Sequence, residues 1–423
     1  MPTRAMASRS AVMPLLEIFP SSGNQYTHGR ADGGGFKKPV ASSSAAFADK
    51  TNALPTIAAN LSALMAGNDY VPRPPLPIFL LSFGCVCGND EGMKTQIMHL
   101  FYLGLAAVAG MVCPQVSKAA PIPVIFDTDI GDDIDDTWAL ITLLKSPQFD
   151  IQLVTTTFGK AEYRARLAAK ICQAAGRTDI PIGLGAGGKE GSGPQAEWVK
   201  DYKLSDYPGK IIEDGPGAII ETVNRVAARD GSMTIIAVGP LNTLEAVLKR
   251  EPALATKAHF VGMHGSVRKG YNNSPKPCVE WNVKYVSGAK AVFSAPWRSA
   301  AITPLDTCGL VRLRGENFKA LKDSSDPMVK ILLENYRIWA KKASIDELKE
   351  SSVLFDTVAV YLATPGPKPL LELETLNIAV TDEGMTVINQ AGKTMSVATN
   401  WKDLEGYHRA LVGWLNQPVV KKQ

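Results

Sequence analysis

Six aspartates within ten residues, at positions 127 to 136, form the densest group of reactive side chains in the sequence. They directly follow the apolar run 124–126 and precede a helical pattern that starts at Thr137. Carboxylates packed this closely repel one another and have raised pKa values unless positive charge lies among them. A hard divalent cation would supply that charge, and ligation by oxygen alone favours Ca²⁺ or Mg²⁺ over Zn²⁺. Capping of the helix N-terminus would account for only one or two of these acids.

The elements that must position these acids follow from the pattern after Pro121, where short apolar runs alternate with amphipathic segments. We expect buried strands at 122–126, 151–157, 180–184, 234–238, 259–263 and 300–303 and helices at 137–144, 162–175, 218–228, 244–249 and 328–342. The late segment 371–414 has strand and then helix character. Such alternation predicts an α/β fold, with a mostly parallel central sheet, helices on both faces and a Rossmann-like core. Ligands of such sheets bind beyond the carboxyl ends of the strands, which is where the aspartates fall.

Composition excludes several other classes of protein. Of the 423 residues, 45% are hydrophobic and 20% charged, as in an ordinary globular protein. A net charge of +4, without a run of five Lys or Arg residues, argues against nucleic acid as a partner. Six cysteines without a Cys-x-x-Cys pair argue against a zinc ribbon and a disulfide scaffold. No uninterrupted apolar run reaches the roughly 18 residues of a membrane span, so no stable membrane anchor is expected.

The first part of the chain differs in composition from the rest. Residues 1–92 are rich in Ser, Ala, Gly and Pro and are expected to be poorly ordered. Residues 93–120 combine a short basic start, an apolar run and a small-residue cleavage pattern, as a secretory signal peptide does. We therefore hypothesise that translation begins at Met93, and that residues 121–423 form a periplasmic or secreted catalytic domain. The alternative is a cytoplasmic protein whose N-terminal extension contains an internal apolar helix.

Several motifs resemble, in order, those of the inosine/uridine-preferring nucleoside hydrolase family. The resemblance extends over most of residues 121–415 and rests on the following segments: the Asp-x-Asp-x-Gly turn 127–131 with Asp135-Asp136, Thr155–Gly159, Gly239–Thr243, Glu280–Asn282 and Asp356. It implies a calcium-dependent hydrolase that splits a ribonucleoside into free base and ribose, in purine or pyrimidine salvage. The family tends to form homodimers or homotetramers, so a homo-oligomer is expected.

The resemblance also implies roles for individual metal-binding residues. Asp129 would be both a Ca²⁺ ligand and the general base that activates water. Asp136 and Asp356 would be further ligands, and Asn242 would offer its backbone carbonyl. The loop between Gly131 and the aspartate pair is one residue longer here than in the commonest family form, so Asp133 could also be a ligand.

The substrate contacts implied by the resemblance come from two parts of the chain. Asp135 would bind a ribose hydroxyl, whereas Glu280, Asn282 and Asn273 would hydrogen-bond the 5′ end of the ribose. Trp281 could stack on the nucleobase, because an indole ring offers a large flat apolar surface. A Trp residue at this position could equally be an anchor in the core.

Three positions depart from the family pattern. Phe355 occupies the position of a histidine that protonates the base in members that favour inosine and uridine, and a phenyl ring donates no proton. Lys160 replaces a common asparagine, and could bind an anionic group of the substrate or simply be an exposed lysine at a helix start. His264, at a position that is usually glycine, is a candidate catalytic acid, although a lone histidine is more often structural. The preferred base is therefore left open.

Two other interpretations compete with a nucleoside hydrolase. The run 126–129 also resembles the start of haloacid-dehalogenase-type phosphatases, but no later Asp-x-x-x-Asp pair follows a strand and the other acids would be unexplained. The second alternative is a non-catalytic calcium- and nucleoside-binding homologue that has lost its acid at Phe355. It would differ from the enzyme only in turnover.

Overall fold

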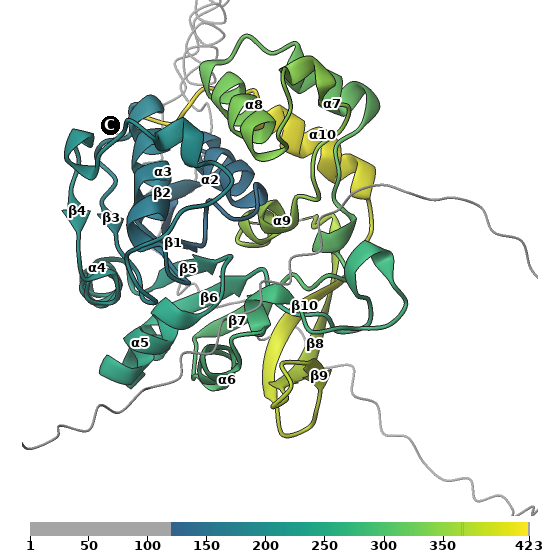
Figure 1. Ribbon diagram of the computed structural model, residues 1–423. Coiled ribbons are helices and arrows are strands. Elements are labelled where there is room, and N and C mark those ends of the chain that lie inside the picture. Colours follow the sequence, from purple (N-terminus) through teal and green to yellow (C-terminus); the bar gives the residue numbers. More distant parts are fainter. Residues whose placement is uncertain (1–119, 365, 367, 422–423) are drawn as a thin grey trace, which may run out of the picture. The chain divides into compact units, whose positions relative to one another are not determined.

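In the computed structural model, which describes residues 120–364, 366 and 368–421, the expected alternation of strands and helices is confirmed (Figure 1). The strands are β1 Ile122–Thr128, β2 Phe149–Thr156, β3 Ile182–Gly183, β4 Ile211–Ile212, β5 Met233–Ala237, β6 Ala258–Gly262, β7 Ser299–Ile302, β8 Leu371–Val380, β9 Thr386–Ile388 and β10 Lys393–Trp401. The α-helices are α2 Asp135–Lys145, α3 Ala161–Ala174, α4 Gly215–Asp230, α5 Asn242–Arg250, α6 Val286–Ser294, α7 Gly315–Lys322, α8 Pro327–Trp339, α9 Phe355–Leu362 and α10 Leu404–Leu415.

One sheet contains all ten of these strands, in the order β4-β3-β2-β1-β5-β6-β7-β10-β8-β9. The pairs from β4 to β10 are parallel, and β8 pairs in antiparallel fashion with both β10 and β9. Chain order runs outward from β1 in both directions, because β2 lies on one side of it and β5 on the other. A reversal of this kind opens a crevice at the carboxyl ends of the two central strands. The segments after β1 and β5 therefore meet at the place where a ligand is expected.

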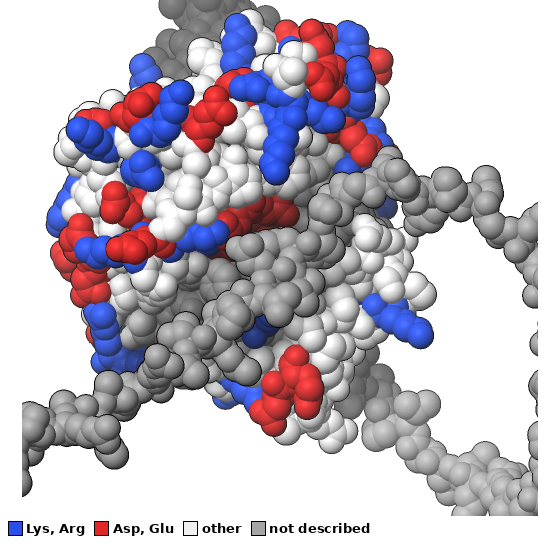
Figure 2. Space-filling model, viewed as in Figure 1, with Lys and Arg blue, Asp and Glu red and all other residues white. Residues whose placement is uncertain are grey.

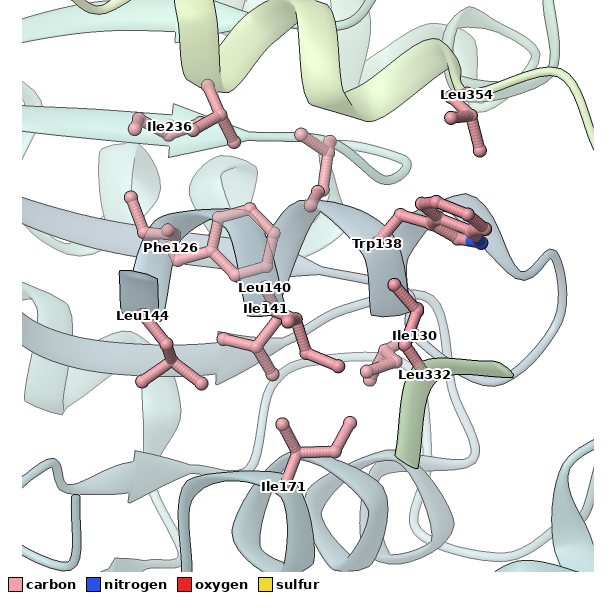
Figure 3. Packing of buried hydrophobic residues seen from close by; sticks show 14 of the residues in the cluster. Phe126, Ile130, Trp138, Leu140, Ile141, Leu144, Ile171, Ile236, Leu332 and Leu354 are labelled. Atoms are coloured by element: carbon pink, nitrogen blue, oxygen red, sulfur yellow. The ribbon is translucent and has the colours of Figure 1, made fainter. Parts of the chain in front are cut away.

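Two apolar layers, one on each face of the sheet, hold the helices in place. Side chains alternate along a strand, so Phe126 of β1 faces one layer and Ile125 faces the other. Figure 3 shows the first layer, in which Phe126 lies against Leu140 and Ile141 of α2, and this layer also includes α3, α8, α9 and α10. The second layer contains apolar residues of α4, α5 and α6. Helices thus cover both faces, as the sequence predicted.

Sequence patterns did not predict helix α9 or the way the late strands join the sheet. The late segment does contain strands and then a helix, and β10 joins the sheet through its parallel pairing with β7. Helix α9 was not foreseen, because it has only eight residues and those from Asp356 to Leu362 are all buried. Periodicity alone does not distinguish so short a buried helix from a buried strand.

The two N-terminal segments distinguished by composition, 1–92 and 93–120, lie outside the described residues except for Ala120. The proposed start at Met93 and the signal peptide therefore stay predictions. Among the helices that the structure describes, none combines the length and the apolar character that a membrane crossing needs.

Candidate active site

The aspartate-rich segment leaves β1 at the centre of the sheet, and its first acid is part of the strand. Asp127 is fully buried, and its Oδ1 accepts a hydrogen bond of 2.6 Å from Thr155 Oγ1 on β2. Burial raises the pKa of Asp127 well above its usual value, although the Thr155 hydroxyl opposes this rise. Its Oδ2 has no hydrogen-bond partner among the described residues. Asp127 therefore lies beneath the loop rather than at its surface.

One acid of the segment is neutralised by the protein itself. Asp132 forms ion pairs with Lys160 Nζ at 2.7 Å and with Arg164 Nη2 at 2.8 Å. Lys160 is the N-cap residue of α3, where the backbone is left-handed with φ of 50°. Lys160 thus lies at a helix start, as one of the two alternatives expected, but it is partly buried rather than exposed and its charge has a partner within the protein.

Three other acids converge from distant parts of the chain. Carboxylate oxygens of Asp135, Asp136 and Asp356 lie within 4.8 Å of one another, and all three residues are buried. Asp135 and Asp136 begin α2, and Asp356 lies in the first turn of α9. The Asp356 backbone N–H donates to Asp135 Oδ2 at 3.3 Å, and Thr128 Oγ1 donates to Asp136 Oδ1. Two helix N-termini therefore face this cluster, which favours negative charge there.

Capping does not explain the cluster. The N-cap residue of α2 is Ile134, and no side chain caps that end of the helix. Burial, followed by repulsion from neighbouring carboxylates, raises the pKa values of Asp135, Asp136 and Asp356 well above normal. Carboxylates in such surroundings are stable in the ionised form only beside a positive charge.

Asp129 lies next to this cluster and beside the turn that follows β5. Its side chain is buried, and its carboxylate contributes to the raised pKa values of Asp135, Asp136 and Asp356. Burial, opposed by Arg164, raises the pKa of Asp129 itself to about 7. A Cβ on Gly239 would lie 2.7 Å from Asp129 Oδ1, so only glycine allows this close approach.

The two remaining predicted ligands occupy the rim of the cluster and the turn after β5. Asp133 is accessible to solvent, and its Oδ1 accepts the Ile134 N–H at 2.7 Å. Asn242 begins α5, and its Oδ1 is buried without a hydrogen-bond partner among the described residues. The donors gathered here are all oxygens, and some of them lack partners, which fits a hard divalent cation rather than zinc. Acidic surface is visible within a hollow on one face of the molecule (Figure 2).

Ionised Glu280 and the side-chain oxygen of Asn282 offer hydrogen-bond acceptors to a ligand. Glu280 is buried, and its two oxygens accept the N–H groups of Gly265 at 2.9 Å and Asn282 at 2.8 Å. The Asn282 Nδ2 group donates to the carbonyls of Val238 at 2.8 Å and Met263 at 3.0 Å, which leaves its Oδ1 to face other partners. Burial raises the pKa of Glu280 to about 7, and the Asp129 carboxylate adds to this rise. The two residues therefore suit hydroxyl groups rather than anions.

Trp281 is a surface residue rather than a core anchor, because 45% of it is exposed. Its ring meets Phe158 edge-on with centroids 5.8 Å apart, and Lys284 Nζ lies 5.0 Å from its centroid. Its backbone N–H donates to the Tyr271 hydroxyl at 3.0 Å, and the Tyr271 ring meets Phe355 edge-on. Exposed aromatic surface thus lies beside both Glu280 and Asp356. Asn273 is exposed on the short 3₁₀ turn Tyr271–Asn273.

His264 lies in the apolar layer behind the turn after β5. It is fully buried, its Nε2 lies 3.1 Å from the Gly239 carbonyl oxygen, and its Nδ1 has no partner among the described residues. The rings of Phe260 and Phe293 lie 5.8 and 6.1 Å from its centroid. Burial lowers the pKa of His264 to about 4, so the ring is neutral near pH 7. A neutral, enclosed ring is poorly suited to protonate a leaving group, which favours the structural alternative.

The sequence patterns did not single out Arg164, which is fully buried on α3. It donates to backbone carbonyls in the loops after β1 and β2 as well as to Asp132. The sequence does contain a pattern that indicates a buried arginine here. Arg164 lies shortly after a strand end, on the same helix face as the apolar residues Ala161, Ala165 and Ala168. A charged residue on such a face needs a buried partner.

Comparison with known proteins gives one consistent result. A family model described as inosine-uridine preferring nucleoside hydrolase matches residues 124–410. Uridine nucleosidase 1 of Arabidopsis thaliana is 25% identical over 310 residues, covering 69% of this chain and 88% of that protein. Probable uridine nucleosidase 2 of the same plant is 29% identical over 318 residues, covering 70% of this chain and 91% of that protein.

Solved structures share the fold. A plant nucleoside hydrolase superposes with a TM-score of 0.57 at 22% identity, over 70% of this chain and all of that one (100%). A purine-preferring ribonucleoside hydrolase from Gardnerella vaginalis superposes with a TM-score of 0.56 at 21% identity, over 70% of this chain and 98% of that one.

Proposed function

Because the chain belongs to the inosine-uridine preferring nucleoside hydrolase family and hydrolyses ribonucleosides to free base and ribose, we propose that Ca²⁺ bound by its aspartates serves this reaction. The family binds a metal ion, and the buried convergence of Asp135, Asp136 and Asp356 is the observation that supports a site for it here. Ca²⁺ takes about six to eight oxygen ligands in flexible geometry, whereas Mg²⁺ requires a near-ideal octahedron and retains several waters. A site so rich in carboxylates favours Ca²⁺.

The proposed ligands are those expected from the motifs. Carboxylates of Asp129, Asp133, Asp136 and Asp356 would bind the ion, together with the backbone carbonyl of Asn242. A bound Ca²⁺ would orient both the attacking water and the ribose hydroxyls. Asp135, which lies against Asp136 and Asp356, would accept a hydrogen bond from a ribose hydroxyl at the edge of the ion.

Asp129 is the proposed general base. It would accept a proton from the attacking water at its carboxylate, and a base is most effective when its pKa lies near the operating pH. Gly239 and the carbonyl contacts of Arg164 support this role, because they restrict where the carboxylate can lie. Holding the base against its target in this way removes much of the entropic barrier to attack.

The proposed substrate is a nucleoside rather than a nucleotide. Glu280 and Asn282 Oδ1 would accept hydrogen bonds from hydroxyls at the 5′ end of the ribose, with Asn273 as a further contact. A 5′-phosphate has no hydrogen to donate to these acceptors when ionised, and it would be repelled by the carboxylate of Glu280. Uridine 5′-phosphate should therefore be a far poorer substrate than uridine.

The base would lie against Trp281 and leave without a histidine to protonate it. Of the three described histidines, His264 is enclosed, His259 lies near the amino end of β6, and His408 is on α10 beside Glu405. We therefore propose that solvent supplies the proton, or that the base leaves as an anion. Bases that are good leaving groups should react fastest.

The two competing interpretations lose their support. The family match covers residues 124–410, which leaves no basis for the phosphatase interpretation. The non-catalytic alternative is disfavoured because the curated relatives are named as nucleosidases and ribonucleoside hydrolases.

The test is release of base from ribonucleosides by the full chain. Uridine is the first substrate, because the curated relatives carry its name, followed by inosine, adenosine, cytidine and nicotinamide riboside. We expect release that is lost on chelation and restored by Ca²⁺, and lost in Asp129→Ala. Asp230→Ala is the matched control, since Asp230 is exposed at the amino end of β5. Turnover that survives both chelation and the loss of Asp129 would contradict the proposed mechanism.

We further propose that the protein is exported through the signal at 93–120, acts in nucleoside salvage and forms a homodimer or homotetramer. The sequence pattern supports export, and the resemblance supports the rest. N-terminal sequencing of the native protein checks the first proposal, since residues found before Met93 would contradict it. Light scattering measures the oligomeric state.

A further inference from the structure

Arg164 uses every donor of its guanidinium group to join the two loops at the centre of the sheet. Its Nη1 donates to the carbonyls of Asp129 and of Ile130, the latter at 3.1 Å, within the loop after β1. Its Nε donates to the Gly159 carbonyl at 2.9 Å, and its Nη2 to the Phe158 carbonyl at 3.3 Å, within the loop after β2. The second N–H of Nη2 donates to Asp132 Oδ2 at 2.8 Å. A guanidinium has five N–H donors, so none remains for a ligand.

Both loops have backbone conformations that need such support. Gly131 has φ of 109°, and the consecutive residues Phe158, Gly159 and Lys160 have φ of 60°, 71° and 50°. Left-handed conformations are unfavourable for residues other than glycine and persist only where the surroundings fix them. Two of the carbonyls that Arg164 binds belong to this left-handed run, and Phe158 carries the ring that meets Trp281.

Arg164 also separates one acid from the cluster. The Asp132 carboxylate is bonded to both Arg164 and Lys160, although Lys160 is partly exposed and Arg164 is fully buried. The Asp132 carboxylate repels those of Asp129 and Asp133. Without the buried guanidinium of Arg164 to offset its charge, this repulsion would be stronger.

We propose that Arg164 is a positioning residue for nucleoside hydrolysis, which fixes the backbone of Asp129 and holds Asp132 away from the cation. This inference rests on the proposed function of the aspartate cluster. It adds that the geometry of the metal-binding loop is set from α3 before any ligand binds. It also connects the metal side of the site with the aromatic side, because the same guanidinium holds Phe158.

The test compares Arg164→Lys with Arg166→Gln in the full chain. Lysine keeps the charge but cannot bond both loops at once. Arg166 lies two residues along the same helix, and its guanidinium donates to the Val199 carbonyl rather than to either loop of the described site. Ca²⁺ alone is titrated by calorimetry, and kcat and KM are measured with uridine. We expect Arg164→Lys to weaken Ca²⁺ binding about 10- to 100-fold, the usual effect of losing a group that orients metal ligands. Its kcat should fall as well, and Arg166→Gln should match the wild type within about twofold.

A general loss of stability must be distinguished from a loss of positioning. Val226→Ala serves this purpose, because Val226 is buried in the opposite apolar layer and its truncation should lower the urea midpoint without changing Ca²⁺ affinity. Asp132→Ala removes one of the contacts of Arg164 and tests the same idea if Arg164→Lys does not fold. We expect it to weaken Ca²⁺ binding about tenfold, at the lower end of the same range.

Folded Arg164→Lys or Asp132→Ala protein with wild-type Ca²⁺ affinity and kcat would overturn the proposal while leaving the proposed function intact. Failure of the wild type itself to bind Ca²⁺ would instead contradict the proposed cofactor, and with it this role of Arg164. The two failures are therefore distinguishable in one set of titrations.

Discussion

The close approach between Gly239 and Asp129 gives the sharpest test of the proposed general base. In Gly239→Ala, the new Cβ would lie 2.7 Å from Asp129 Oδ1, 2.7 Å from Thr157 Cγ2 and 2.8 Å from the Asp129 nitrogen. Ordinary contacts begin at 3.4 Å, so the pair must separate by about 0.7 Å, the difference between 3.4 and 2.7 Å. Neither side moves easily, because Arg164 holds the Asp129 carbonyl and Thr157 Oγ1 bonds the Pro240 carbonyl at 2.7 Å.

The expected cost follows from this displacement. Adding a methyl group to a packed site costs about 1–3 kcal/mol of unfolding free energy, which a domain of this size should survive. A shift of about 1 Å in a catalytic group can cost about 100-fold in rate. For a shift of about 0.7 Å, we expect kcat for uridine to fall between about 10-fold and 100-fold.

The assay measures kcat and KM for uridine together with urea unfolding. Gly413→Ala is the matched control, because Gly413 lies on α10 and a Cβ there would meet no atom within 4 Å. Alanine should stabilise that helix by up to about 1 kcal/mol and leave kcat unchanged. If folded Gly239→Ala retained kcat within about twofold of the wild type, the reasoning that places the reaction at Asp129 would be refuted.

Three further predictions concern the metal, His264 and the leaving group. Without metal, the raised pKa values of the buried aspartates make the folded state bind more protons than the unfolded state, so stability should fall as pH rises from about 4 to about 7. Urea midpoints measured against pH in EDTA should show this fall, and Ca²⁺ should remove most of it; a rise in EDTA would contradict the assignment. His264→Gln should lose about 1–3 kcal/mol of stability with little change in the pH profile of kcat, whereas a loss of more than about tenfold in kcat would restore His264 as a catalytic candidate. Finally, p-nitrophenyl riboside should be hydrolysed about 100-fold faster than inosine, because a general acid contributes about 10²–10⁴-fold for poor leaving groups; equal rates would indicate an acid in the site.

Much of the fold was predictable because its signals are local. Each expected strand of the parallel half is present within a few residues of its predicted bounds, since buried parallel strands are continuous apolar runs. The two-residue strand β4 and helix α9 were not predicted. Strand β4 has two residues that are only partly buried, so no longer apolar run marks it. The eight residues of α9 are too few for periodicity to distinguish a buried helix from a buried strand.

The sequence alone therefore determined the class of fold, the family and the place of the acids at a strand end, because these depend on residue types at short spacing. Tertiary structure decided which charges meet. It brought Asp356 next to Asp135, although the two residues are 221 positions apart in the sequence. It also paired Asp132 with Arg164 in an ion pair and enclosed the His264 ring between Phe260 and Phe293. It also turned the Asn282 amide group inward, so that its Oδ1 is the part of the side chain left for a ligand. Periodicity follows from backbone hydrogen bonds between near neighbours, whereas the partner of a charge depends on how the crossovers bring distant loops to one edge of the sheet.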